Sequence, residues 1–67
     1  MGTLAELKTQ NHWVTMMQIE HEEEGWKYWI SVLEIESGAE TLNVHTPDYL
    51  TARDSFTAAV TRSLEDV

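Results

Sequence analysis

Three histidines and a run of carboxylates are the side chains of this sequence that could hold a metal ion. His21 directly precedes three consecutive glutamates at 22–24, and His12 and His45 are further nitrogen donors in the 67-residue chain. A helical metalloprotease motif needs a second histidine four residues after the first, and Gly25 occupies that position. The chain also has no cysteine, which excludes a thiolate metal site and a thiol nucleophile. We therefore expect no metal site and no cofactor.

Acid–base and nucleophilic catalysis are the other chemistries that these residue types could support. Two carboxylates act as general acid and base only where a cleft separates their pKa values, and one domain of this length has little volume for a cleft. The glycines stand at positions 2, 25 and 38, so the chain has neither a hydrolase nucleophile elbow nor a glycine-rich phosphate loop. The sequence predicts a protein that is not an enzyme.

The net charge of −8, from 12 acidic and 4 basic residues, bears on the kind of partner. Affinity for nucleic acid comes from lysine and arginine that neutralise phosphates, so direct binding to nucleic acid is not expected. Segment 18–40 holds seven glutamates against Lys27, whereas 1–17 is neutral and 41–67 has a net charge of −2. Such carboxylates can imitate phosphates and steer the domain to a basic cleft. We expect a protein partner with a basic surface; in size and charge the chain resembles small phage inhibitors that act as nucleic-acid mimics.

Hydrophobic periodicity predicts the elements that position these residues. Residues 13–20 alternate with a period of two, 26–35 are dense in aromatic and β-branched types, and 41–46 alternate before the single proline. Gly25 and Gly38 stand in the turns between these segments. The pattern predicts a three-stranded antiparallel β-meander with 26–35 as its central strand.

The last third of the chain changes to a helical period. A narrow apolar stripe comprises Ala52, Ser55, Phe56, Ala59, Val60 and Ser63, with Leu64 at its margin. Thr51 and Asp54 have capping-box spacing, which favours a helix that begins there over an earlier start at Thr46–Pro47. In segment 1–11, Leu4 and Leu7 lie three apart, which indicates either a frayed end or a short docking helix. The fold class is a single α+β domain whose amphipathic C-terminal helix packs on one face of the sheet.

The predicted central strand is apolar on both faces. One face would present Trp29, Leu33 and Ile35, and the other would present Trp26, Tyr28, Ile30 and Val32. A single helix covers only one face of a sheet. The second face is either covered inside the chain, by segment 1–11 or through a β-bulge, or buried in a homodimer or against another protein. We favour burial between chains, because aromatic residues and methionine are enriched at interface cores.

These inferences predict a non-catalytic interaction domain with two binding surfaces. We assign the apolar surface to Trp26, Tyr28, Ile30 and Val32, and the acidic surface to Glu22, Glu23, Glu24, Glu34 and Glu36. The alternative is a structural or homodimeric subunit, or an antitoxin-like module, that uses the apolar face without mimicry.

Two segments carry the antitoxin resemblance. Glu-Gly-Trp at 24–26, followed by Thr-Ala-Arg-Asp at 51–54, is similar to the layout of small antitoxin domains, although their proline-rich segment and DNA-binding tail are missing.

Apolar runs of at most three residues cannot cross a bilayer, and the first residues are not basic. We therefore expect a cytoplasmic protein with no membrane contact.

Overall fold

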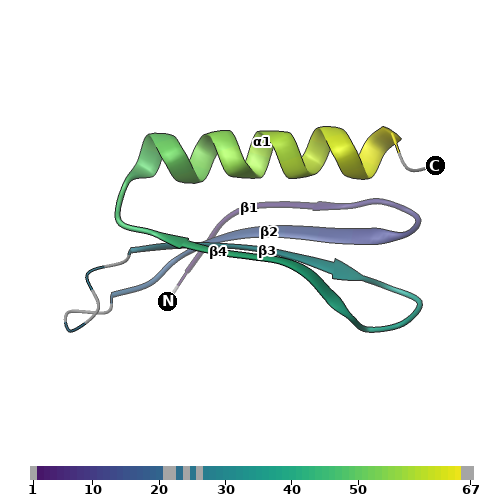
Figure 1. The fold of residues 1–67 in the computed structure, drawn as a ribbon, viewed down its shortest axis with the longest axis horizontal. Helices are drawn as coiled ribbons and strands as arrows, with labels where there is room; N and C mark the ends of the chain where they lie inside the picture. The colour runs from purple at the N-terminus through teal and green to yellow at the C-terminus, as the bar shows by residue number, and fades with distance from the viewer. Residues whose placement is uncertain (1, 21–22, 24, 26, 66–67) are drawn as a thin grey trace.

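A four-stranded antiparallel sheet carries one helix on one face (Figure 1). The computed structural model describes residues 2–20, 23, 25 and 27–65. The strands follow one another across the sheet in chain order: β1 (Gly2–Lys8), β2 (His12–Gln18), β3 (Tyr28–Glu34) and β4 (Glu40–Thr46), before α1 (Tyr49–Glu65). The α+β class, the antiparallel meander and the C-terminal helix are confirmed, but the predicted number of strands was one too few.

The additional strand is β1, in the segment predicted to be frayed or helical. It pairs with β2 from Gly2 opposite Gln18 to Lys8 opposite Trp13. The register shifts at Leu4, so this bulge breaks the alternation of side chains in the strand. Because the bulge interrupts the two-residue period of the strand, the three-residue spacing of Leu4 and Leu7 resembled one turn of a helix, and the local pattern was misleading.

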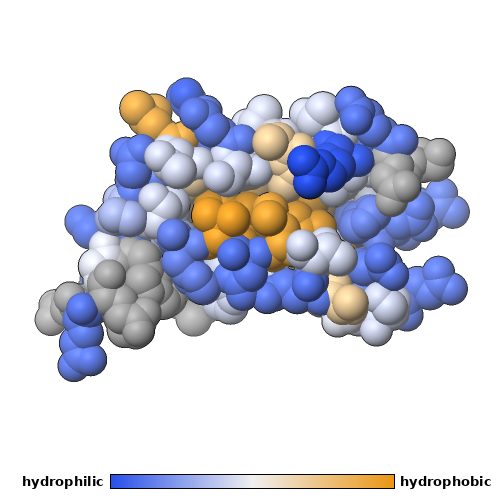
Figure 2. Space-filling view, in the orientation of Figure 1, coloured by the Kyte–Doolittle hydropathy of each residue, from blue (hydrophilic) through white to orange (hydrophobic). Residues whose placement is uncertain are grey.

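The hydrophobic core lies between α1 and the sheet face that holds Val14 and Ile30. Both side chains are 0% exposed. The helix presents Ala52 and Ala59, whose small side chains let it approach the sheet closely, together with Phe56. In Figure 2, apolar side chains gather along the seam between α1 and β4. The predicted stripe is confirmed: Ala52, Ala59 and Ser63 are buried, Ser55, Phe56 and Val60 are half-buried, and Leu64 is exposed.

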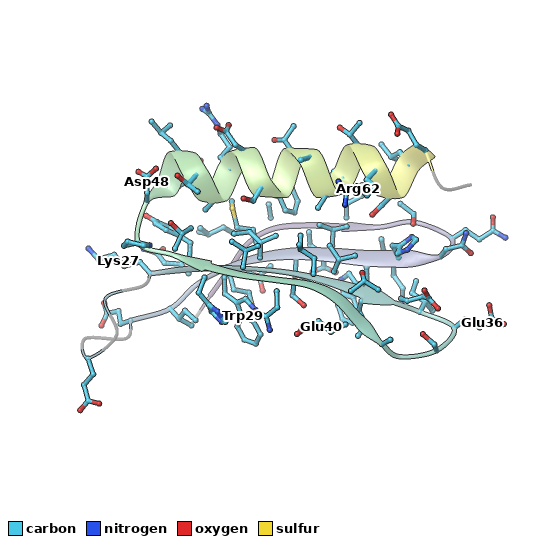
Figure 3. The ribbon with its side chains drawn as sticks, in the orientation of Figure 1. Lys27, Trp29, Glu36, Glu40, Asp48 and Arg62 are labelled. Carbon is cyan, nitrogen blue, oxygen red and sulfur yellow. The ribbon has the colours of Figure 1, made fainter. Side chains whose placement is uncertain are left out.

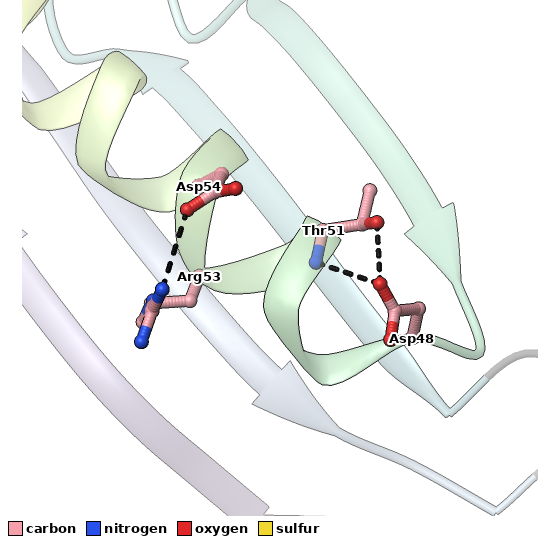
Figure 4. Close-up of polar contacts among 4 residues, drawn as sticks. All are labelled: Asp48, Thr51, Arg53 and Asp54. Carbon is pink, nitrogen blue, oxygen red and sulfur yellow. Dashed lines mark hydrogen bonds and ion pairs between the residues drawn. The ribbon is translucent and has the colours of Figure 1, made fainter.

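The helix begins at Tyr49, earlier than the predicted start at Thr51. Asp48 caps it: its Oδ2 accepts hydrogen bonds from the Thr51 backbone N–H at 3.0 Å and from Thr51 Oγ1 at 2.6 Å (Figure 4). The cap satisfies one of the backbone N–H groups that have no partner inside a helix. The capping box from Thr51 to Asp54 was therefore the wrong prediction, since the Thr51 hydroxyl donates to Asp48. Asp54 Oδ1 instead lies 3.7 Å from Arg53 Nη2.

The cap predicts how acid changes the stability of the helix. Hydrogen bonds from the Thr51 side chain and backbone lower the pKa of Asp48 below its ordinary value of 3.8. A carboxylate with a lowered folded-state pKa stabilises the fold above that ordinary value, and the contribution is lost as the pH falls through the folded-state pKa. We expect Asp48→Ala to lower the melting temperature by roughly 5 °C at neutral pH. This difference from the unmodified chain should narrow in acid.

Thermal denaturation followed by circular dichroism, near neutral pH and again well below the ordinary pKa of Asp48, measures both effects. Asp54→Ala is the matched control, because Asp54 is exposed and takes no part in the cap. An Asp48→Ala difference of the same size at both pH values would contradict the charged cap.

Candidate functional site

The sheet face turned away from α1 is the candidate site, and we call it the open face. No helix or strand among the described residues covers it. The strand registers arrange its side chains in three rows across the sheet: Lys8, Trp13, Leu33 and Glu40; Glu6, Thr15, Ser31 and Asn43; Thr3, Met17, Trp29 and His45. Trp29 and Glu40 extend from this side of the sheet, opposite the helix (Figure 3). Odd positions of β2 and β3 therefore form the face.

Trp13 is held in place by two neighbours on β1. Its indole Nε1 donates a hydrogen bond to Glu6 Oε1 at 3.0 Å. Lys8 Nζ lies 5.4 Å from the centroid of the Trp13 ring, within the range of a cation–π contact. Trp13 remains 37% exposed, so this ring is an oriented apolar surface that is available to a partner.

At the other edge of the open face, contacts between β3 and β4 hold the side chains in place. Glu40 accepts hydrogen bonds on both carboxylate oxygens, from Ser31 Oγ at 2.8 Å and from Asn43 Nδ2 at 2.6 Å. The Trp29 ring stacks on His45, with ring centroids 5.5 Å apart and an angle of 30° between the planes. These contacts limit the rotamers of side chains that otherwise face solvent, which lowers the entropy that a partner must remove on binding.

A shallow groove of about 350 Å³ crosses the open face. Its lining comprises Thr3, Glu6, Trp13, Thr15, Met17, Ser31 and Leu33. Apart from Glu6, the lining is neutral, with hydroxyl groups between apolar side chains. This composition suits an apolar or aromatic side chain of a partner better than a polyanion.

A second cavity, of about 500 Å³, opens between the C-terminal half of α1 and the strands β3 and β4. It is lined by His12, Val32, Thr41, Leu42, Ala59, Arg62, Ser63 and Glu65. Arg62 and Glu65 contribute opposite charges, so the cavity has no net preference for an anion or a cation.

Of the four residues predicted to form the apolar binding surface, the three that the structure describes, Tyr28, Ile30 and Val32, lie on the other side of the sheet. Ile30 and Val32 are 0% and 6% exposed, because α1 covers them. Tyr28 is half-buried, and its ring meets Tyr49 edge-on at 5.6 Å. Trp26 lies outside the described residues. The face that the sequence assigned to a partner is thus the core face, and the open face is the one that holds Trp29 and Leu33.

The residues paired across the strands explain why α1 packs on the sheet face that holds Ile30. Ile30 pairs with Met16 and Val44, both apolar, so this face is continuous across three strands. On the opposite face, Ser31 pairs with Thr15 and Asn43, which interrupt the apolar surface. Comparing all three strands at once would have identified the core face from the sequence, whereas β3 alone could not.

Of the five glutamates predicted to form the acidic surface, the three that the structure describes divide between the two ends of the molecule. Glu23 is exposed in the β2–β3 connection, while Glu22 and Glu24 lie outside the described residues. Glu34 ends β3, and Glu36 is exposed in the turn that follows. The length of β3, roughly 20 Å for a strand of this size, separates the two groups. Figure 3 accordingly shows Lys27 and Glu36 at opposite ends of the sheet, so among the described glutamates Glu23 does not share one surface with Glu34 and Glu36.

The base of the β2–β3 connection is closed by a backbone hydrogen bond. The N–H of Ile19 donates to the carbonyl of Lys27 at 2.8 Å, and the N–H of Lys27 donates to the carbonyl of Thr46 at 3.1 Å. Ile19 itself is only 8% exposed. The ends of the connection are therefore anchored to the sheet, and Glu20 and Glu23 are exposed beyond that anchor.

Among the described residues, no group of three or more histidine, aspartate or glutamate side chains is placed to hold a metal ion. The described helix is not long and apolar enough to cross a membrane. Comparison with family models, curated proteins and solved structures finds no match for this chain.

Proposed function

We propose that this chain is a non-catalytic binding domain that recognises a protein with a basic surface through its acidic β2–β3 connection. The observation that carries the proposal is the closed base at Ile19 and Lys27. The sequence places four glutamates and no other charged residue between these two positions. Anchoring both ends of so short a connection concentrates negative charge at one end of the molecule.

The rest of the chain does little to neutralise this charge. Among the four cations, Lys27 stands at the base of the connection, and the others lie on β1 and α1. Lys8 sits over the Trp13 ring, and Arg53 lies beside Asp54. A concentrated charge that its own chain does not compensate raises the rate of encounter with an oppositely charged protein, most strongly at low salt.

Proteins that hold nucleic acid are the partner class with the most suitable surface. Their ligand sites display lysine and arginine for phosphates, and closely spaced carboxylates can occupy the same positions. A chain with a net charge of −8 is itself repelled by nucleic acid. The domain would accordingly displace DNA or RNA from its partner protein and would not form a complex that contains both the partner and the nucleic acid.

Displacement of DNA is the direct test. Purified basic DNA-binding proteins are loaded with labelled DNA, and release of the label is followed by fluorescence anisotropy as the chain is added at low and at physiological salt. The charge-reversal triple variant carries Glu22→Lys, Glu23→Lys and Glu24→Lys. It should need a concentration at least tenfold higher than the unmodified chain to release the DNA. Raised salt should weaken displacement by the unmodified chain far more than by the triple.

The control reverses three exposed acidic residues elsewhere: Glu36→Lys, Asp54→Lys and Glu65→Lys. Both triples raise the net charge from −8 to −2, so they differ only in where the change lies. The control should displace DNA nearly as well as the unmodified chain. Equal loss in the two triples would show that total charge matters and would refute recognition through the connection.

A further inference from the structure

We propose that the open face packs against the open face of a second copy of this chain, about a twofold axis that runs along the strands between β2 and β3. This proposal uses a different surface from the acidic connection and does not depend on it. It rests on the strand registers, which fix which side chains oppose one another when two such sheets meet.

The twofold axis places β1 of one copy over β4 of the other. Lys8 and Glu40 lie at the two edges of the same cross-strand row. Rotation about an axis along the strands exchanges these edges, so Lys8 lies opposite the partner's Glu40, and the same pair forms again at the other edge. An isologous interface thus contains two ion pairs from one cation and one carboxylate per chain.

The same rotation places β2 over β3 at the centre of the interface. Trp13 then packs on the partner's Leu33, and Met17 packs on the partner's Trp29. Between these rows, Thr15 lies opposite the partner's Ser31. Facing sheets pack about 10 Å apart with their strands nearly aligned, a spacing that side chains of these sizes fill.

The other simple twofold arrangement, with its axis across the strands, fits poorly. It would place Glu6, in the middle row, opposite Glu6 of the partner subunit. It would also place Lys8 opposite the partner's Thr3 and leave both ion pairs unformed. Like charges that face each other at close range oppose association, so the register favours the axis along the strands.

Charge distribution favours a second copy over a basic protein on this face. The open face carries Glu6, Glu40 and Lys8, a net charge of −1 out of the −8 of the chain. Both carboxylates already accept hydrogen bonds from their own chain. Two copies can therefore meet here with most of their negative charge outside the interface.

The size of the face sets the expected strength. Four strands of seven residues cover on the order of 450 Å² per copy, from their usual spacing and rise. This area is at the lower limit for specific interfaces and indicates a weak, reversible dimer. We expect a dissociation constant for the dimer from about 10 to a few hundred micromolar, so the test must cover high protein concentrations.

Sedimentation equilibrium from about 5 to about 500 µM, a range that brackets this affinity, measures the dimer. Lys8→Glu alone and Glu40→Lys alone should each weaken it at least fivefold, because each places like charges opposite one another. The combined exchange, Lys8→Glu with Glu40→Lys, should restore the dissociation constant to within about threefold. Three strand spacings, about 14 Å, separate Lys8 from Glu40 within one chain, so a rescue reports a contact between chains.

A second pair of variants tests the apolar centre. Met17→Lys should weaken the dimer at least tenfold, whereas Leu64→Lys, on the exposed side of α1, should leave it unchanged. Melting temperatures of all variants confirm that each is folded. A chain that stays monomeric at the highest concentration, or an exchange variant no better than its single parents, overturns the proposal. Either result leaves DNA displacement by the acidic connection to be decided by its own triple variant.

Discussion

Replacing Ile30 with alanine should cost about 3 kcal/mol of unfolding free energy, a large share of the roughly 3–10 kcal/mol expected for a chain of this length. Ile30 is 0% exposed and lies between Met16 and Val44 on the neighbouring strands. Above it α1 presents Ala52, which has no side chain long enough to fill the vacated space. The cavity therefore persists, and its cost adds to the lost burial of the three carbon atoms.

Urea denaturation followed by circular dichroism measures this loss. Leu50→Ala is the matched control, because Leu50 is 55% exposed on α1 and loses little burial when shortened. The control should change the unfolding free energy by less than about 0.5 kcal/mol. Similar losses in the two variants would mean that the core does not lie where α1 meets β3.

Three strands and the helix were predictable because each carries its own hydrophobic period. The strands β2, β3 and β4 fall within two residues of the predicted segments at each end, and α1 buries the predicted stripe. The start of the helix was not predictable from the stripe alone. Asp48 and Thr51 both have capping side chains, and only the hydrogen-bond geometry shows that Asp48 accepts and Thr51 donates.

The binding surfaces were harder to predict, because they depend on contacts between segments that are distant in the sequence. A strand that is apolar on both sides, such as β3, does not reveal which side a helix will cover. Its registers with β2 and β4 decide this, since polar Thr15 and Asn43 flank only Ser31. In the same way, a count of the glutamates in segment 18–40 treats them as one group. The length of β3 separates the glutamates that precede this strand from those at and after its end.

The two proposed surfaces can act in the same molecule. A dimer through the open face buries Trp13 and Met17 but leaves the β2–β3 connections outside the interface, beyond the ends of the strands. With the axis along the strands, both connections lie at the same end of the dimer. Two acidic connections side by side would give a basic partner two points of attachment, and bivalent attachment raises apparent affinity without any new kind of contact.

Removing β1 should abolish cooperative folding, although the sequence pattern alone predicted a frayed or helical segment there. A chain in which Met is followed directly by Thr9 loses every pairing of β1 with β2, and the core cluster around Met16 loses Ala5. The strand β2, with Trp13 and Met17 on its open side, then becomes an exposed apolar edge, which favours aggregation. We expect loss of the thermal transition and growth of particles in light scattering.

Deleting only Gly2 is the control for this truncation. Gly2 is exposed, and a Cβ atom at its position would meet nothing within 4 Å. The control removes one pairing at the end of β1 and should lower the melting temperature by no more than about 3 °C, since strand ends fray at little cost. If the longer truncation also melted cooperatively within that range, β1 would contribute nothing to the stability of the fold.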